Sequence, residues 1–146
     1  MTGTIKQLYI THNNTAKTRQ NVSSIFVDKF GIKGDKFYNK NQMRSILITS
    51  QESYNLALAN EIDIQDGSLG ENILIDISPY SLFQGDRIKI GTTILEITQN
   101  CTLCQGLASI NSKLPKLLKN DRGIFAKYIE GSSEILLGSR VQILNS

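Results

Sequence analysis

Residues 86–98 of this chain have the sequence DRIKIGTTILEIT. Polar and apolar residues alternate over residues 86–90, Gly91-Thr92 supplies a turn, and the alternation returns over residues 93–98. A period of two places successive side chains on opposite faces of a strand, and a short turn containing glycine joins antiparallel strands. The stretch therefore predicts a β-hairpin with one buried and one exposed face.

Other parts of the chain carry similar strand signals. Segments rich in β-branched and aromatic residues predict strands at residues 5–10, 22–27, 45–49, 72–76, 123–129 and 141–144. Thr49 and Glu52 have the spacing of a capping box, which predicts a short helix after Thr49. Residues 105–119 predict one or two helical turns interrupted at Pro115, because proline lacks the amide proton. Some seven or eight short strands favour a mainly β fold, a β-barrel with one or two short helices, since closure removes edge strands.

Length and composition limit the class of protein. The 146 residues are 40% hydrophobic and 20% charged, as expected for one globular domain over residues 1–146. No apolar run approaches the roughly 20 residues of a membrane span, and the N-terminus lacks a secretory signal. Sixteen basic and thirteen acidic residues give a net charge of +3, too scattered to predict nucleic-acid binding. We therefore expect a cytoplasmic protein that binds neither membrane nor nucleic acid.

The two cysteines, Cys101 and Cys104, stand three residues apart directly after a predicted strand. A reducing compartment would keep them as thiols. A structural zinc site needs four ligands, and the sequence adds only the distant His12, to which we assign no role. A thioredoxin-like dithiol begins a helix in a βαβ unit, a pattern that this sequence lacks. The remaining interpretations are inert packing thiols or one reactive thiolate stabilised by nearby cations.

Three basic residues are candidates for those cations: Lys36, Arg44 and Arg122. Arg44 ends a polar loop before one predicted strand, and Arg122 stands just before another. Each alone is typical of a solvated surface charge, but together with a cysteine they would form an anion pocket that binds phosphate through bidentate hydrogen bonds. Glu71 and Asn72, between a turn and a strand, either orient a ligand or cap the turn.

Six short motifs occur in a specific order. They are Gly31-Ile32-Lys33-Gly34-Asp35-Lys36, Arg44 before a strand, Gly70-Glu71-Asn72-Ile73, residues 85–91, residues 97–99 leading to Cys104, and residues 122–126. Together they resemble the MOSC domain, the module found at the C-terminus of molybdenum cofactor sulfurases and as small stand-alone bacterial proteins. The match runs from about Val22 to Leu144. The resemblance implies a strongly bent β-barrel of the MOSC and PK-barrel type, with a single pocket cysteine.

The resemblance also implies roles for individual residues. Cys104, five residues after Gln99, takes the position of the family's cysteine and is the implied catalytic residue; Cys101 is then an additional thiol. A thiolate is both a good nucleophile and a soft metal ligand, so Cys104 would carry sulfur as a persulfide or bind molybdenum. The implied cofactor-binding residues are Lys36, Arg44, Asn72 and Arg122. Phe37 stands where the family frequently has a histidine, which removes one pocket hydrogen-bond partner.

The implied function is sulfur transfer or binding of a molybdenum-pterin cofactor. As an enzyme, the protein would be a sulfur transferase or would reduce N-hydroxylated compounds with molybdenum and electrons from a partner protein. The alternative is a non-catalytic module that delivers sulfur or cofactor to a molybdoenzyme. Pyridoxal phosphate belongs to a separate domain of the sulfurases, for which 146 residues leave no room, so we expect neither that cofactor nor desulfurase activity.

We predict that Cys104 reacts faster than Cys101 with a thiol-selective alkylating reagent, because only Cys104 occupies the family's pocket position. Neighbouring cations would favour its thiolate, which is the reactive form. Mass mapping of the labelled peptides after brief treatment measures both rates. Equal labelling, or faster labelling of Cys101, would contradict the assignment.

Overall fold

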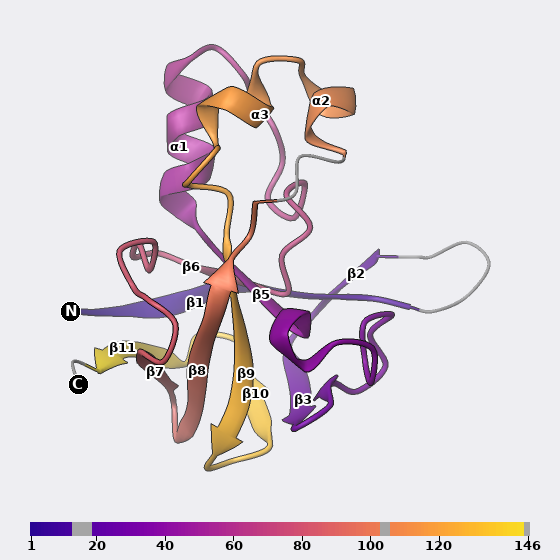
Figure 1. The fold of residues 1–146 in the computed structure, drawn as a ribbon, viewed down its shortest axis with the longest axis vertical. Coiled ribbons are helices and arrows are strands. Elements are labelled where there is room, and N and C mark those ends of the chain that lie inside the picture. Colours follow the sequence, from indigo (N-terminus) through magenta and orange to yellow (C-terminus); the bar gives the residue numbers. More distant parts are fainter. Residues whose placement is uncertain (13–18, 103–105, 145–146) are drawn as a thin grey trace.

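The computed structural model describes residues 1–12, 19–102 and 106–144, which form the strands and helices of Figure 1. In chain order these are β1 (Thr2–Thr11), β2 (Arg19–Val22), β3 (Ser24–Asp28), β4 (Gly31–Ile32), the 3₁₀ turn η1 (Gln42–Arg44), β5 (Ile46–Ser50), α1 (Gln51–Ala59), β6 (Ile73–Ile75), β7 (Arg87–Ile90), β8 (Thr93–Asn100), α2 (Leu107–Ile110), α3 (Leu114–Leu117), β9 (Ile124–Glu130), β10 (Glu134–Leu136) and β11 (Arg140–Leu144).

Seven strands close into a barrel in the order β1, β6, β5, β9, β8, β7 and β11, with β11 pairing back onto β1. Along β1, residues 2–4 pair with β11, residues 5–8 pair with β6, and residues 8–11 pair with β2. Of the described barrel pairs, β5 and β6 run parallel and the others run antiparallel. The closed barrel confirms the fold class expected from the sequence.

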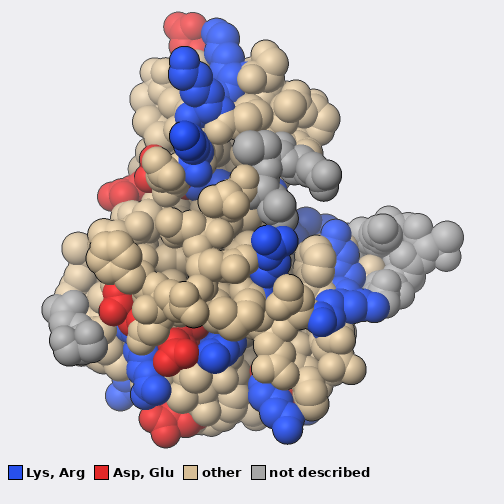
Figure 2. Space-filling model, in the orientation of Figure 1, with Lys and Arg blue, Asp and Glu red and all other residues tan. Residues whose placement is uncertain are grey.

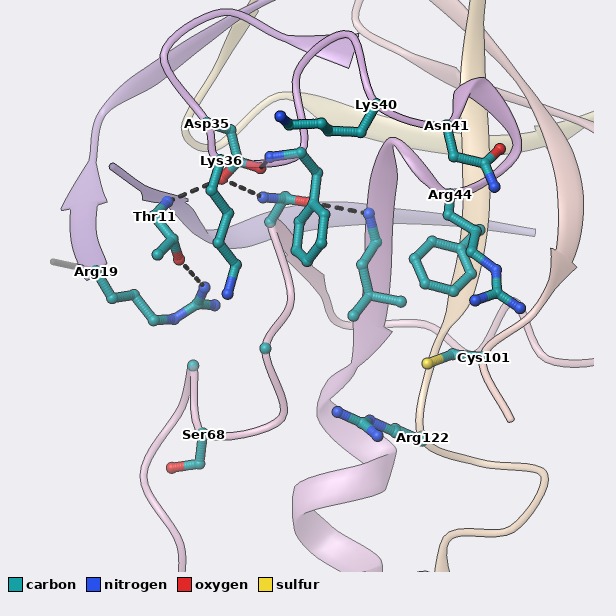
Figure 3. Close-up of a pocket in the computed structure, with 16 residues that line it drawn as sticks. Thr11, Arg19, Asp35, Lys36, Lys40, Asn41, Arg44, Ser68, Cys101 and Arg122 are labelled. Atoms are coloured by element: carbon teal, nitrogen blue, oxygen red, sulfur yellow. Dashed lines mark hydrogen bonds between the residues drawn. The ribbon is translucent and has the colours of Figure 1, made fainter. Parts of the chain in front are cut away.

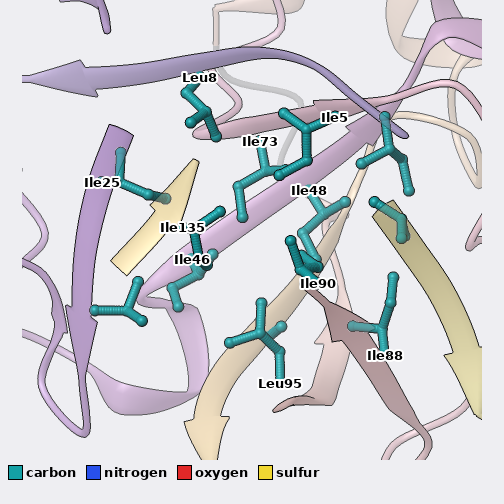
Figure 4. Packing of buried hydrophobic residues seen from close by; sticks show 14 of the residues in the cluster. Ile5, Leu8, Ile25, Ile46, Ile48, Ile73, Ile88, Ile90, Leu95 and Ile135 are labelled. Carbon is teal, nitrogen blue, oxygen red and sulfur yellow. The ribbon is translucent and has the colours of Figure 1, made fainter. Parts of the chain in front are cut away.

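The predicted hairpin forms one wall of this barrel. Ile88 and Ile90 on β7 and Leu95 on β8 are buried, whereas Arg87 and Lys89 are exposed. Isoleucine and leucine side chains from the other strands meet them in the interior (Figure 4). Burial of each such side chain stabilises the fold by roughly 1.5–3 kcal/mol, so the alternation seen in the sequence translates directly into the barrel core.

One predicted strand is divided in two. Residues 22–27 were expected to form a single strand, but the chain changes sheets at Ser23. Before Ser23, β2 pairs with β1 of the barrel; after it, β3 pairs with β10 and β4 in a separate three-stranded sheet. The predicted strands did not include β4 and β10, because two or three residues are too short to show a periodicity.

The helix expected after Thr49 is present but begins one residue later than predicted. Ser50 is its N-cap, with a side-chain oxygen that accepts a hydrogen bond from the Glu52 amide at 3.1 Å. Thr49 is instead a buried strand residue whose hydroxyl donates to the Arg122 carbonyl at 3.0 Å. The sequence alone does not separate these adjacent hydroxyl residues, since either one can cap a helix.

Residues 105–119 were expected to be interrupted at Pro115. The described part forms two short helices, and Pro115 lies in the first turn of α3. Its missing amide proton costs no hydrogen bond there, so the proline begins a helix rather than breaking one. Side chains of α1, α2 and α3 bury a second, smaller core above the barrel (Figure 1). None of the helices among the described residues has the length and apolar character needed to cross a membrane.

Replacing Ile48 by alanine is expected to lower the free energy of unfolding by about 2–5 kcal/mol, because this fully buried side chain of β5 would leave a cavity in the barrel. Phe83→Ala is the control, since Phe83 is 79% exposed and its truncation should cost less than about 0.5 kcal/mol. Urea unfolding measures both variants. If both variants lost a similar amount of free energy of unfolding, Ile48 would not lie in the barrel core.

Candidate functional site

A pocket of about 730 Å³ opens between the barrel, the loop that precedes β5 and the segment that precedes β6 (Figure 3). Its walls come from separate stretches of the chain, and they bring together four residues predicted from the sequence: Lys36, Arg44, Asn72 and Arg122. Cys104, the fifth predicted residue, lies outside the described residues. The structure thus gathers the four described candidates at one pocket, and their roles toward a ligand stay predictions.

Five cationic side chains line the pocket. Besides Lys36, Arg44 and Arg122, the described lining residues include Lys40 and Arg19. Figure 2 shows basic side chains gathered on this side of the molecule, over β2 and the loop around η1. The one carboxylate among the described lining residues belongs to Asp35. The pocket is therefore strongly positive, and such a cleft attracts anions.

Asp35 is a buried side chain whose carboxylate is committed to the protein itself. One oxygen accepts hydrogen bonds from the Thr11 amide at 2.8 Å and the Asn72 side-chain amide at 3.3 Å. The other accepts from the Phe37 amide at 3.1 Å. These bonds hold the loop after Gly34 against β1, which directs Lys36 toward the pocket. The candidate residues from the sequence did not include Asp35, although it follows a glycine in the first motif.

Asn72 belongs to the pocket wall. Its side-chain oxygen accepts a hydrogen bond from the Leu47 amide at 3.0 Å, and its nitrogen donates to the Tyr9 carbonyl at 3.2 Å and to Asp35. Both amide protons are thus used by protein groups, and the residue is 5% exposed. Asn72 positions the strands around the pocket, and its contact with a cofactor stays a prediction.

Arg19 is a pocket residue that the sequence did not reveal. Its guanidinium stacks over the Tyr9 ring at 4.7 Å and donates to the Thr11 hydroxyl at 3.2 Å and to the Glu71 carbonyl. It also lies 3.8 Å from the Glu71 carboxylate. Arg19 begins β2, but in the sequence it belongs to a polar stretch after the first predicted strand, where nothing local distinguishes it from a solvated charge.

Glu71 points away from the pocket into the protein, where its side chain is fully buried. The carboxylate accepts hydrogen bonds from the Tyr54 hydroxyl at 2.6 Å and from the Gly67 amide at 3.2 Å. Burial raises the pKa of Glu71 above its usual range, while the Tyr54 hydrogen bond and the Arg19 charge oppose that shift. Of the two roles left open for Glu71, these contacts favour the structural one.

The MOSC domain family model matches residues 34–142. This chain belongs to the MOSC domain family. Among solved structures it is similar to the YuaD protein from Bacillus subtilis, with 21% identity and a TM-score of 0.82 over 97% of this chain and 94% of that one. YiiM from Escherichia coli is 15% identical, with a TM-score of 0.70 over 98% of this chain and 70% of that one.

YiiM from Geobacillus stearothermophilus gives the same identity and TM-score over 97% of this chain and 75% of its own. At these identities the neighbours show the fold alone. A search of curated proteins found no match. The family match confirms the resemblance that the sequence motifs indicated.

Within the MOSC pocket, Cys101 is the described thiol. It is 4% exposed, packs against Leu47 and Phe125, and lines the pocket as a free cysteine. Figure 3 shows Cys101 on the same side of the pocket as Arg44, with Arg122 below them. In the sequence analysis, the resemblance to the MOSC domain left Cys101 as an additional thiol. Its place in the pocket wall follows only from the fold.

The buried position of Glu71 predicts a pH-dependent stability. Since its pKa is raised, the folded state binds the carboxyl proton more tightly than the unfolded state, and stability falls as the pH rises from the ordinary pKa of 4.5 toward the folded value. Glu71→Gln removes this titration. The difference in free energy of unfolding should therefore shift in favour of the variant as the pH rises above the ordinary pKa of 4.5. Urea unfolding at several pH values measures it, and a pH-independent difference would contradict the raised pKa.

Proposed function

We propose that this MOSC-domain protein binds a phosphorylated molybdenum-pterin cofactor in its cationic pocket, with Cys104 as the thiolate for molybdenum. The observation that carries the proposal is the cavity of about 730 Å³ with five cationic side chains around it. Its one described lining carboxylate, Asp35, is already satisfied by three N–H donors. Positive charge therefore predominates among the described residues that line the cavity.

The residues present fit such a cofactor. The cavity volume lies within the range of about 300–1,000 Å³ that is usual for small-molecule and cofactor sites. Guanidinium groups bind phosphate oxygens through paired hydrogen bonds. Phe37, Leu47 and Phe125 add apolar surface to the lining, against which a flat heterocyclic ring can pack. Thiolate sulfur is a soft ligand suited to transition metals.

The protein's own groups would bind, orient and shield the cofactor. Lys36 and Arg44 come from the two ends of the loop that Asp35 holds, and Arg122 comes from the turn before β9. Leu47 and Phe125 keep the region around Cys101 apolar. When bound, the cofactor supplies two-electron redox chemistry at molybdenum, which side chains alone do not provide.

As an enzyme, the protein would reduce N-hydroxylated compounds. In this reaction two electrons and two protons break the N–O bond of R–NH–OH and give R–NH₂ and water. The electrons would come from a separate redox protein. A sulfur carrier requires only an accessible cysteine, so the large cationic cavity favours cofactor binding over persulfide transfer.

Protein produced in a host that makes the cofactor is expected to contain about one molybdenum and one pterin per chain, because the pocket retains both parts of the ligand. Elemental analysis and pterin fluorescence measure them. Cys104→Ser should lose most of the molybdenum, whereas the matched variant Cys101→Ser should keep it, with circular dichroism checking that both fold.

Molybdenum and pterin at background levels in the wild type would overturn the proposed function, and a persulfide on Cys104 without molybdenum would favour the sulfur-carrier alternative. Loaded protein can then be supplied with a reduced viologen and an N-hydroxylated compound. Formation of the amine identifies an enzyme, and its absence identifies a module that delivers the cofactor.

A further inference from the structure

We propose that exposed lysines on the helical layer formed by α1, α2 and α3, together with the loop before β5, make a docking surface for a small acidic redox protein that delivers electrons to the pocket. The lysines are Lys113, Lys116 and Lys119, here called the lysine stripe, and none of the three lines the pocket. The need for an electron donor comes from the proposed function, on which this inference rests. The surface itself follows from the charge and exposure of the described residues.

The basic residues are unevenly distributed along the chain. Residues 29–44 and 106–120 contain eight of the sixteen Lys and Arg residues and a single carboxylate, Asp35. That carboxylate is buried and accepts hydrogen bonds from three N–H groups. The rest of the chain has eight basic and twelve acidic residues. The net charge of +3 therefore combines two strongly basic segments with a remainder whose net charge is negative.

The lysine stripe covers the outer side of α3. Its members are spaced three residues apart, so they lie on one side of the helix and of the turn that follows it. Leu114 and Leu118 between them are buried in the helical core, whereas all three lysines are exposed. Within the described residues, no ion pair uses any of the three. Like charges at this spacing repel one another, so the packing of α3 does not account for the stripe.

The loop before β5 adds a second basic group on the same face. Lys40 and Arg44 of this loop are exposed and line the pocket. Figure 2 shows basic side chains over the helical layer and further ones over the loop around η1, all visible from one side. Since residues 45–86 contain neither Lys nor Arg, the basic side chains of the helical layer come from the segment that carries the stripe. A single partner can therefore contact both groups.

The stripe leads to the side of the pocket that holds the described thiol. Arg122 follows Lys119 by three residues and lines the pocket, where Figure 3 shows it beside Cys101. Arg44 lies on the same side of the pocket. A protein docked on the stripe and on the loop around η1 would place its redox group close to this part of the pocket.

The surface favours an acidic protein over a membrane or a nucleic acid. A helix that lies on a membrane inserts apolar side chains, but Leu114 and Leu118 are already buried in the protein. Proteins that read a DNA duplex place a longer helix or a pair of strands in a groove, and α3 has four residues. The negative remainder of the chain repels a long polyanion that extends beyond the patch, but not a compact partner.

The electron balance of the proposed reaction defines the chemistry of the donor. Two electrons and two protons break the N–O bond of R–NH–OH and give R–NH₂ and water. One fully reduced flavin supplies both electrons and becomes oxidised, and two reduced iron–sulfur clusters supply the same number. Flavodoxins and plant-type ferredoxins carry these groups on small acidic proteins, so they have the charge that the lysine stripe would attract.

The test measures association of cofactor-free protein with a flavodoxin and with a plant-type ferredoxin by biolayer interferometry. For the donor that binds, the association rate constant is expected to fall at least tenfold between about 20 mM and about 300 mM salt, because salt screens exposed charges. At low salt, Lys113→Gln/Lys116→Gln/Lys119→Gln should lower it at least tenfold. Failure of both donors to bind, or wild-type association by this variant, would overturn the docking surface.

A matched control removes three charges elsewhere. Arg87 and Lys89 on β7 and Arg140 on β11 are exposed and lie away from the helical layer (Figure 1). Replacing all three by glutamine changes the net charge equally and should alter the association rate constant less than about threefold. Equal slowing by the two triple variants would indicate an effect of net charge and refute the stripe. Circular dichroism checks folding, which glutamine should preserve because Lys113, the N-cap of α3, makes no side-chain capping hydrogen bond.

Two further probes test the competing kinds of partner. A short DNA duplex and vesicles of equal parts phosphatidylcholine and phosphatidylserine offer negative charge without a redox group. Both are expected to bind more weakly than the acidic donor at the same salt concentration. Tighter binding of either probe, with loss in the lysine-stripe variant, would assign the surface to nucleic acid or to a membrane and overturn the proposal.

Electron delivery separates this inference from the proposed function. In protein loaded with molybdenum, the lysine-stripe variant should reduce the N-hydroxylated compound at least tenfold more slowly with the acidic donor, and at the wild-type rate with reduced viologen, a small cation. Protein that binds the donor through the stripe but never contains molybdenum would uphold the docking surface and reject the proposed function. Loaded protein that accepts electrons from viologen but binds neither acidic donor would do the reverse.

Discussion

The side-chain amide of Asn72 connects three parts of the chain around the pocket: β1 through the Tyr9 carbonyl, β5 through the Leu47 amide, and the loop after Gly34 through Asp35. β5 and β6 are the parallel neighbours of the barrel, and Asn72 stands just before β6 begins. A buried amide that lost one of these partners would leave an unsatisfied polar group at a cost of about 1–3 kcal/mol. The arrangement of the pocket walls depends on this one side chain.

The concentration of positive charge around the pocket opposes folding, since five cations in one cleft repel one another. Two carboxylates offset part of this repulsion. Asp35 lies in the wall, and Glu71 lies behind it against Arg19. Glu71 is itself unfavourable as a buried charge, as its raised pKa indicates. A site that keeps such groups despite their effect on stability is typical of a functional pocket, where binding rather than stability determines the residues.

Two structural units contribute to the pocket. The turn over residues 67–71 is held by Tyr54 of α1, whereas the loop that ends at Arg44 leads into β5 of the barrel. A ligand of the size proposed would contact both units at once, so its binding would stabilise their arrangement relative to each other.

The sequence by itself determined the closed mainly β fold, the hairpin over residues 86–98, the helix after β5 and the MOSC family, because strand alternation, capping residues and short motifs are local signals. It also pointed to Lys36, Arg44 and Arg122 as candidates for one anion pocket, with Arg44 and Arg122 each placed next to a predicted strand. Only the tertiary structure decided that Arg19 joins them, that Glu71 turns inward and that Cys101 lines the pocket. The Arg19 to Glu71 carbonyl contact spans 52 positions in sequence. No periodicity within a strand or helix encodes such a contact, since it exists only once β2 and the turn before β6 are packed against the same strand.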